Sequence, residues 1–282
     1  MNNFKDIIKP FIPKKLKPII LRQYRRLFEK KPLVDLSTKY QSLQNMQALK
    51  CTIAYNKYGG YCVPLSSHHR PNAQYILGGG VAEPDTIEYM IKNCKNGDII
   101  SAGAYYGDFL PALSEGVSNN AKVWTFEPNI ENYLCAKITL EINYIKNTIL
   151  TNTGLGEKEE VKLLATKDVS GRSLGGTSRV IHSSEKIRDM TDLDSIRIVT
   201  IDDIINEDRS ISILQLDVEG YELEALKGAL KTIKRCLPII IIEELEQNIG
   251  STKNSDWFHN NILSLGYEQT NKLHKNLVFS CN

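Results

Sequence analysis

From Gly97 onward, short apolar runs alternate with helix-like segments, and this alternation restricts the possible folds more than any other feature of the chain. The runs that we predict as strands are Asp98–Ala102, Lys122–Phe126, Thr148–Thr153, Val161–Ala165, Ile198–Ile201, Ile211–Leu216 and Ile239–Glu243. Helical spacing of apolar residues separates several of them, as in Ile130–Asn143 and Tyr221–Cys236. Such a pattern indicates βαβ units and a parallel sheet with helices on both faces. We therefore expect an α/β, Rossmann-like domain over residues 96–282.

The segment before this domain is predicted to form a cap, made of a hairpin and a helix, over residues 51–95. Two strand-like runs, Thr52–Tyr58 and Tyr61–Leu65, flank a Gly-Gly pair that is typical of a tight hairpin. A loop rich in turn residues follows, and Pro84–Asn93 then has the pattern of a helix.

Residues 1–50 are predicted to be a basic, helical N-terminal extension. Residues 1–31 contain ten lysines and arginines against Asp6 and Glu29, so this segment carries +8 and the rest of the chain −6. Apolar residues interleave with the charges, and three interpretations stay open: contact with an anionic membrane surface, docking onto a partner, or packing on the chain's own domain. Because the body of the protein is acidic, we expect no nucleic-acid partner. The oligomeric state is not indicated.

The composition is that of an ordinary globular protein, with 41% hydrophobic and 24% charged residues. The longest apolar runs, such as Pro238–Ile242, are too short to cross a bilayer, and no signal peptide is recognisable. We expect a cytoplasmic protein, or one at the membrane periphery if the N-terminus binds lipid. The six cysteines have no paired spacing, and no metal-ligand spacing appears, so we expect no metal site.

Two carboxylates directly follow the apolar run Ile211–Leu216, in the stretch D-V-E-G-Y-E-L-E-A-L-K-G-A that begins at Asp217. In open α/β sheets, ligands bind in the crevice at the carboxyl ends of the strands. Asp217 and Glu219 are therefore predicted catalytic residues. Glu243 and Glu244, at the end of the next strand, are further candidates on the same rim. The alternative for Glu219 is ordinary stabilisation of a helix N-terminus.

A glycine turn and an acid mark a second site. Gly103 and Gly107 follow the first strand in S-A-G-A-Y-Y-G-D, where glycine lets the backbone approach a ligand closely. Their G-x-x-x-G spacing disfavours a dinucleotide enzyme, and alone it is equally compatible with an unrelated turn. Glu127 ends the second strand, where Rossmann-type folds receive ribose hydroxyls, although a helix-start acid is the alternative. Together the turn and the acid indicate a nucleoside site.

The chain resembles the FkbM family of S-adenosylmethionine-dependent methyltransferases over about residues 80–245. The motifs that carry the resemblance are, in order, G-D-I-I-S-A-G-A-Y-Y-G-D-F, V-W-T-F-E-P-N, T-N-T-G-L-G-E, V-T-I-D-D-I and L-Q-L-D-V-E-G-Y-E-L-E-A-L-K-G-A. This likeness implies that the glycine turn wraps the methionine part of the cofactor, that Glu127 holds its ribose, and that Asn152 and Thr153 lie near its adenine. The residues assigned to S-adenosylmethionine, and to S-adenosylhomocysteine as product, are Ser101, Gly103, Ala104, Tyr105, Gly107, Glu127, Pro128, Asn152 and Thr153.

The chain departs from the family pattern at two of these positions. Ser101 stands where the family usually has an aspartate that contacts the amino group of the cofactor, and Tyr105 stands where it usually has an asparagine. Ser101 can accept a hydrogen bond, but a charge-assisted bond is roughly twice as strong as a neutral one. Asp108, Glu83 and Asp217 are candidate replacements for the acid. Weaker binding, or binding of a relative of the usual cofactor, is the alternative.

The expected acceptor is a hydroxyl oxygen on a sugar, a glycan precursor or a related small molecule. A hydroxyl is barely acidic, so a positioned base is worth about 10²–10⁴-fold in rate. The predicted substrate-binding residues are His68, His69, Arg70 and Arg172, the last of these in a long, glycine-rich loop, Ser170–Arg179. They suit an acceptor that bears phosphate or carboxylate, and plain surface loops are the alternative.

The sequence therefore predicts a methyltransferase that uses S-adenosylmethionine and acts on oxygen. A non-catalytic binding or scaffold protein on the same fold is the rival hypothesis, because a fold does not fix a function. The serine at position 101 is the feature that keeps this rival open.

Overall fold

The computed structural model describes residues 48–181, 193–243 and 252–281, which all belong to one structural unit, Gln47–Asn282. Nearly all of the basic extension predicted over residues 1–50 lies outside these ranges, and so does the candidate acid Glu244. Among the described helices, none combines the length and the apolar character needed to span a bilayer.

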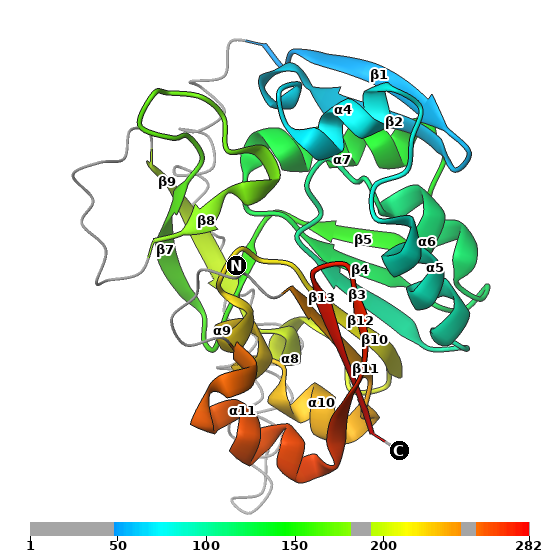
Figure 1. The fold of residues 1–282 in the computed structure, drawn as a ribbon, viewed down its shortest axis with the longest axis vertical. Coiled ribbons are helices and arrows are strands. Elements are labelled where there is room, and N and C mark those ends of the chain that lie inside the picture. The colour runs from blue at the N-terminus through cyan, green and yellow to red at the C-terminus, as the bar shows by residue number, and fades with distance from the viewer. Residues whose placement is uncertain (1–47, 182–192, 244–251, 282) are drawn as a thin grey trace, which may run out of the picture. The chain divides into compact units, whose positions relative to one another are not determined.

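A seven-stranded sheet lies at the centre of the described unit, in the order β12-β13-β11-β10-β3-β4-β5 (Figure 1). Five neighbouring strands, from β11 to β5, are parallel, and β13 and β12 extend the sheet as an antiparallel hairpin. The strands are β3 (Asp98–Ala102), β4 (Val123–Phe126), β5 (Thr148–Thr151), β10 (Ile211–Leu216), β11 (Ile239–Glu243), β12 (Tyr267–Leu273) and β13 (Asn276–Cys281). This arrangement confirms the α/β, Rossmann-like prediction.

Helices cover both faces of this sheet because side chains alternate along each buried strand. In β3, Ile99 packs in one hydrophobic cluster, whereas Ile100 and Ala102 pack in the other. The first cluster includes residues of α5 (Pro84–Asn93), α6 (Leu110–Gly116) and α7 (Ile130–Ile142). The second includes residues of α8 (Ile201–Ile204), α9 (Glu222–Lys227), α10 (Leu230–Cys236) and α11 (Asp256–Asn261). A short break at Gly228 and Ala229 divides the helix that we predicted over Tyr221–Cys236.

The order of the strands reverses between β3 and β10. The chain moves from β3 to β4 and β5 on one side, and the later strands β10 and β11 lie on the other. At such a topological switch point the connections leave in opposite directions, and the carboxyl ends of the two strands border a crevice. The glycine turn after β3 and the acid-rich stretch after β10 therefore meet at one place.

Two strands that we expected in the main sheet belong instead to a separate four-stranded sheet, β6-β9-β7-β8. Its strands are β6 (Gly154–Leu155), β7 (Glu160–Ala165), β8 (Arg179–Val180) and β9 (Leu193–Val199). No helix separates β5, β6 and β7, so the crossover that parallel pairing requires is missing, and β7 pairs antiparallel with β8 and β9. The bounds of the predicted strand Ile198–Ile201 were also wrong. The strand β9 ends at Val199, Thr200 caps α8, and Ile201 begins that helix.

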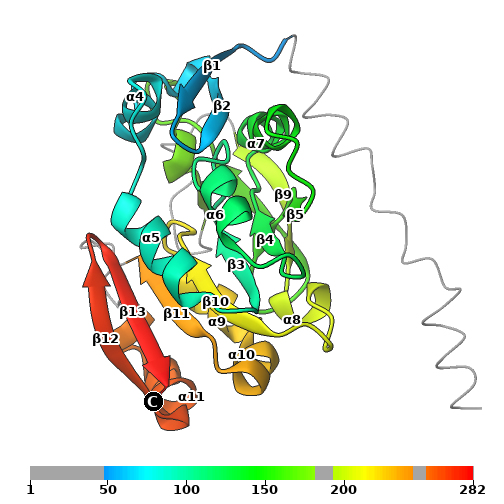
Figure 2. The same cartoon turned by 90° about the vertical axis from the view of Figure 1, so that its right-hand side faces the viewer.

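The hairpin cap packs against α7. It consists of β1 (Cys51–Asn56) and β2 (Gly59–Pro64), and its turn is formed by Lys57 and Tyr58 rather than by the two glycines that the sequence suggests. These glycines instead face Asn143, which exchanges two hydrogen bonds with the backbone of Gly60, of 2.9 and 2.7 Å. The remaining elements are α4 (Pro71–Leu77), which was not predicted, and the short 3₁₀ helices η2 (Leu65–Ser67), η3 (Gly175–Thr177), η5 (Thr252–Asn254) and η6 (Leu263–Leu265). Figure 2 shows the cap beside α7, away from the β12–β13 hairpin.

A buried carboxylate fixes the opposite end of β3. Asp98 is 1% exposed and accepts hydrogen bonds from the backbone of Lys122 (2.8 Å), the indole of Trp124 (2.7 Å) and the Nε of Arg209 (2.8 Å). A second nitrogen of Arg209 pairs with the same carboxylate. Asp98 therefore ties together the strand before the glycine turn, its neighbour β4 and the segment before β10.

We predict that Asp98→Ala lowers the free energy of unfolding by about 3 kcal/mol, because it leaves the Arg209 charge and the Trp124 donor without their buried acceptor. Arg197→Ala is the control. It removes an ion pair with Glu159 whose side chains are 32% and 63% exposed, and should cost less than about 1 kcal/mol. Urea denaturation measures both values, and equal losses in the two variants would contradict this role for Asp98.

Candidate functional site

A cavity of about 350 Å³ lies at the carboxyl ends of β3 and β10. Most of the charged residues in its lining are acidic, and the basic residues are few. The carboxyl groups come from Glu83, Asp108, Glu127, Asp217, Glu219 and Glu243, and the basic residues are Arg70, His274 and Lys275. The structure thus brings the acids predicted after β10 and β11 together with the acid predicted after β4. Two of the candidate replacements for the missing aspartate, Glu83 and Asp108, also line this cavity.

The two predicted motifs meet backbone to backbone. Gly103 has a φ of +88°, and a Cβ atom placed on it would lie 1.9 Å from the carbonyl oxygen of Asp217. The N–H of Asp217 donates to the carbonyl oxygen of Ala102 at 3.2 Å. No side chain larger than hydrogen fits at position 103 while this contact is kept, which explains the glycine physically.

Glu127 holds the glycine turn in place from β4. One carboxylate oxygen accepts the N–H of Tyr105 at 2.8 Å, and the other accepts the N–H of Asn129 at 2.8 Å. Tyr105 has a φ of +48°, in the left-handed region that non-glycine residues rarely adopt. Burial raises the pKa of Glu127 to about 8, although both N–H donors act in the opposite direction. Glu127 is 5% exposed, and it lines the cavity directly.

A smaller cavity of about 40 Å³ adjoins the first, and Gly103, Glu127 and Asp217 line both. Pro128 and Thr153 line the smaller cavity, together with apolar side chains of the four-stranded sheet. The hydroxyl of Thr153 is buried and has no hydrogen-bond partner. An orphaned donor in a partly apolar cavity suits a flat ligand with polar edges, because such a donor is costly unless a ligand pairs with it.

Two predicted cofactor residues act behind the cavity wall. The amide of Asn152 donates to the carbonyl oxygens of Glu127 (2.8 Å) and Pro128 (3.2 Å), and so supports the loop after β4. Ser101 is 4% exposed and donates its hydroxyl to the side-chain oxygen of Gln215 at 2.7 Å. Gln215 itself lines the larger cavity. Sequence reasoning missed Gln215, although its polar side chain inside an apolar strand was a usable signal.

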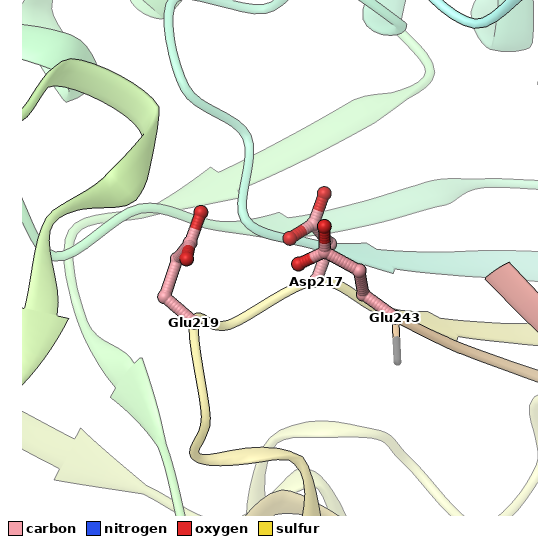
Figure 3. A group of neighbouring side chains, drawn as sticks. All are labelled: Asp217, Glu219 and Glu243. Atoms are coloured by element: carbon pink, nitrogen blue, oxygen red, sulfur yellow. The ribbon is translucent and has the colours of Figure 1, made fainter. Parts of the chain in front are cut away.

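Asp217, Glu219 and Glu243 form a cluster in which one carboxylate oxygen of each residue lies within 4.8 Å of the others (Figure 3). Burial raises the pKa of Asp217 well above its usual value, and the neighbouring carboxylates Glu243 and Glu219 raise it further. Burial, with Glu243 as the next cause, raises the pKa of Glu219 to about 8. Three carboxyl groups so close together favour a cationic ligand, whether an organic cation or a metal ion, because a positive charge offsets the repulsion between their ionised forms.

The backbone after β10 explains the D-V-E-G-Y-E stretch. Glu219 and Gly220 both have positive φ angles, of 56° and 94°. Glu222 is 2% exposed, and one of its oxygens accepts the N–H groups of Val218 and Gly220, each at 3.1 Å. Glu222 therefore holds this turn rather than a ligand. It is a structural acid next to Asp217 and Glu219, which face the cavity.

Of the four predicted substrate residues, Arg70 lines the larger cavity. His68, His69 and Arg172 line neither cavity, and their contact with an acceptor stays a prediction. The loop that contains Arg172 does reach the site. Its residues Gly176 and Thr177 line the larger cavity, and Asn132 of α7 donates to the Gly175 carbonyl at 3.1 Å and so holds the loop there. The turn residues His274 and Lys275 were not predicted, because nothing in the sequence shows which sheet edge their hairpin joins.

The fold is that of a Rossmann-like α/β protein with a cavity at its topological switch point. The sequence profile of the methyltransferase FkbM domain matches residues 101–271, which is more than half of the chain. The chain therefore belongs to the FkbM family of S-adenosylmethionine-dependent methyltransferases, as the resemblance of its motifs implied. A comparison with curated proteins found no match.

The solved structures that match this chain include methyltransferases. A methyltransferase FkbM from Methylobacillus flagellatus KT is 20% identical with a TM-score of 0.44, over 66% of this chain and 43% of its own. A SAM-dependent methyltransferase from Aquifex aeolicus is 14% identical with a TM-score of 0.37, over 70% of this chain and 87% of its own. The tRNA (uracil-54, C5)-methyltransferase of Pyrococcus abyssi, in complex with S-adenosyl-L-homocysteine, is 11% identical with a TM-score of 0.42, over 82% of this chain and 44% of its own.

We predict that Gly103→Ala weakens binding of S-adenosylhomocysteine at least tenfold, because its Cβ would force the turn away from Asp217. Gly171→Ala is a matched control, since Gly171 also has a positive φ of 79°, but a Cβ atom placed on it would have no other atom within 4 Å. Both substitutions carry the backbone strain, about 1 kcal/mol, and only the first adds the collision. Calorimetric titration compares them, and equal affinity in the two variants would overturn this explanation of Gly103.

Proposed function

We propose that this protein transfers a methyl group from S-adenosylmethionine to a hydroxyl oxygen on a sugar, a glycan precursor or a related small molecule. The observation that carries the proposal is the acid-lined cavity where the glycine turn after β3 meets the acid cluster after β10. A cavity with six carboxyl groups and few basic residues favours a cationic ligand, and this cofactor carries positive charge on its sulfur and its amino group.

The residues around the cavity fit the parts of the cofactor. Glu127 keeps both oxygens on backbone N–H groups, and each oxygen retains a lone pair for a ribose hydroxyl. The unpartnered hydroxyl of Thr153, in the smaller cavity, suits a polar edge of the adenine. Asp108 and Glu83 supply the negative charge toward the amino group that Ser101 does not provide.

The bound cofactor supplies an electrophilic methyl group on a positively charged sulfur. Asp217 is our candidate for the base that accepts the proton of the acceptor hydroxyl, because it lines both cavities and belongs to the acid cluster. A raised pKa makes its carboxylate a stronger base once it is ionised. Glu219, whose pKa is raised to about 8, belongs to the same cluster and is our candidate for orienting the acceptor. The remaining task of the protein is alignment, to which the loop residues Gly176 and Thr177 contribute.

We predict that the affinity for S-adenosylmethionine rises with pH between about 6 and 8. In the free protein the pKa is raised to about 7 for Asp108 and to about 8 for Glu127 and Glu219, so these groups hold protons at the lower pH. A bound cation favours their ionised forms, so binding releases protons and is strengthened as pH rises. We expect at least a tenfold change across this range.

S-adenosylhomocysteine is the control for this experiment, because it lacks the sulfonium charge and should show a smaller change. Titrations in two buffers with different ionisation enthalpies report the released protons directly. Affinity that stays constant or falls as pH rises would contradict the electrostatic argument. Absence of binding by both compounds would contradict the proposed function itself and favour a non-catalytic protein on this fold.

We predict a separation of roles between Glu127 and Asp217. Glu127→Ala should weaken cofactor binding on the order of a hundredfold, because hydrogen bonds to a charged group contribute about 1.5–3 kcal/mol each. Asp217→Asn should change affinity less, but lower the rate of methyl transfer by about 10²–10⁴-fold. The rate is measured with a deuterated methyl donor and the acceptor found by mass spectrometry of cell glycans and metabolites. Wild-type turnover in Asp217→Asn would remove it as the base.

A further inference from the structure

We propose that the acceptor is an anion, a hydroxyl compound that carries a phosphate or carboxylate group, and that Arg70 and Lys275 hold this group together. The inference rests on the proposed function, since it concerns the same cavity, and it specifies the class of substrate. It starts from the few basic side chains of a cavity whose charged lining residues are mostly acids.

Arg70 is held in position by the loop that contains Gly176 and Thr177, which line the cavity. It precedes α4, and its Nη2 donates to the hydroxyl of Thr177 at 2.8 Å. Thr177 in turn donates to the carbonyl oxygen of Leu174 at 2.9 Å, so the loop fixes the hydroxyl that receives the arginine. Only one of the terminal nitrogens is used in this contact, and the guanidinium keeps further donors for a phosphate or carboxylate.

Lys275 comes from the other end of the chain. In the sheet, Glu243 at the end of β11 pairs with Asn276 at the start of β13, so the turn His274–Lys275 lies just beyond the carboxyl end of β11. Asn276 is 3% exposed and donates to the carboxylate of Glu83 at 2.8 Å, which fixes the base of this turn beside α5. The register of the β12–β13 hairpin on β11 thus places Lys275 at the cavity.

Neither Arg70 nor Lys275 forms an ion pair with a carboxylate of the described residues. Within the described ranges, no carboxylate lies within the 4.0 Å ion-pair distance of Arg70 or Lys275, whereas Arg209 and Lys227 do form such pairs. Both cations lower the pKa of Glu219, yet burial and Glu243 still raise it to about 8. The pair therefore leaves the acid cluster uncompensated, and its positive charge remains available to a ligand.

The cavity therefore presents both acidic and basic side chains to a ligand. The acid cluster receives a cationic methyl donor and a hydroxyl proton, and it repels any anion. A substrate that carries negative charge can therefore bind in one orientation, with its charged group at Arg70 and Lys275 and its hydroxyl toward Asp217. Opposite charges at neighbouring points of one site fix the orientation of a ligand more than they increase its affinity.

The test is a titration of the full chain, saturated with S-adenosylhomocysteine, with D-glucose 6-phosphate, D-glucuronate and D-glucose. We expect at least one of the two anionic sugars to bind tenfold more tightly than glucose, and the better of the two identifies phosphate or carboxylate as the recognised group. Arg70→Met and Lys275→Met should each weaken that binding at least fivefold, and added salt should weaken it further.

Arg235→Met and Lys272→Met are the matched controls, because both residues are exposed and line neither cavity. They should change the binding less than twofold, and none of the four variants should alter the affinity for S-adenosylhomocysteine. Equal affinity for glucose and both anionic sugars, or equal effects in test and control variants, would overturn the inference. If the wild type fails to bind S-adenosylhomocysteine at all, it is the proposed function that fails.

Discussion

The backbone contact between Gly103 and Asp217 is the constraint on which the rest of the site depends. The two residues come from distant parts of the sequence, and they touch so closely that any Cβ at position 103 would overlap the Asp217 carbonyl. The contact is possible because β3 and β10 are neighbours at the point where the strand order reverses. It brings the turn held by Glu127 against the acid cluster, and both cavities open beside it.

The electrostatics of the site follow from this geometry. Carboxyl groups that would separate in water are held together in a partly buried space, and the pKa values of Asp217 and Glu219 rise as a result. Such an arrangement costs stability, and it is typical of functional sites, where a ligand completes the charge balance. Two other buried acids have partners outside this cluster. Asp98 is paired with Arg209, and Glu222 accepts two backbone N–H groups.

Much of this was predictable from the sequence, because strand pattern and motif position are local signals. Apolar runs separated by helical segments predicted the parallel strands. Position at the end of a strand then identified Glu127 and the acids after β10 and β11. What could not be predicted depends on distant pairing. The separate β6–β9 sheet arises because no helix connects β5 to β7, and Lys275 reaches the cavity only through the register of β13 on β11. Gln215 had a local signal, a polar side chain in an apolar strand, but its hydrogen bond from Ser101 depends on the pairing of β10 with β3.

The central claim is that the cavity at the Gly103–Asp217 contact is the cofactor site of a methyltransferase. A crystal structure of the protein with S-adenosylhomocysteine tests this most directly. The account predicts the ribose hydroxyls within hydrogen-bond distance of Glu127, the adenine beside Thr153, and the sulfur facing the cluster that contains Asp217. A cofactor bound elsewhere on the chain, or an empty cavity in crystals grown with a large excess of the compound, would contradict it.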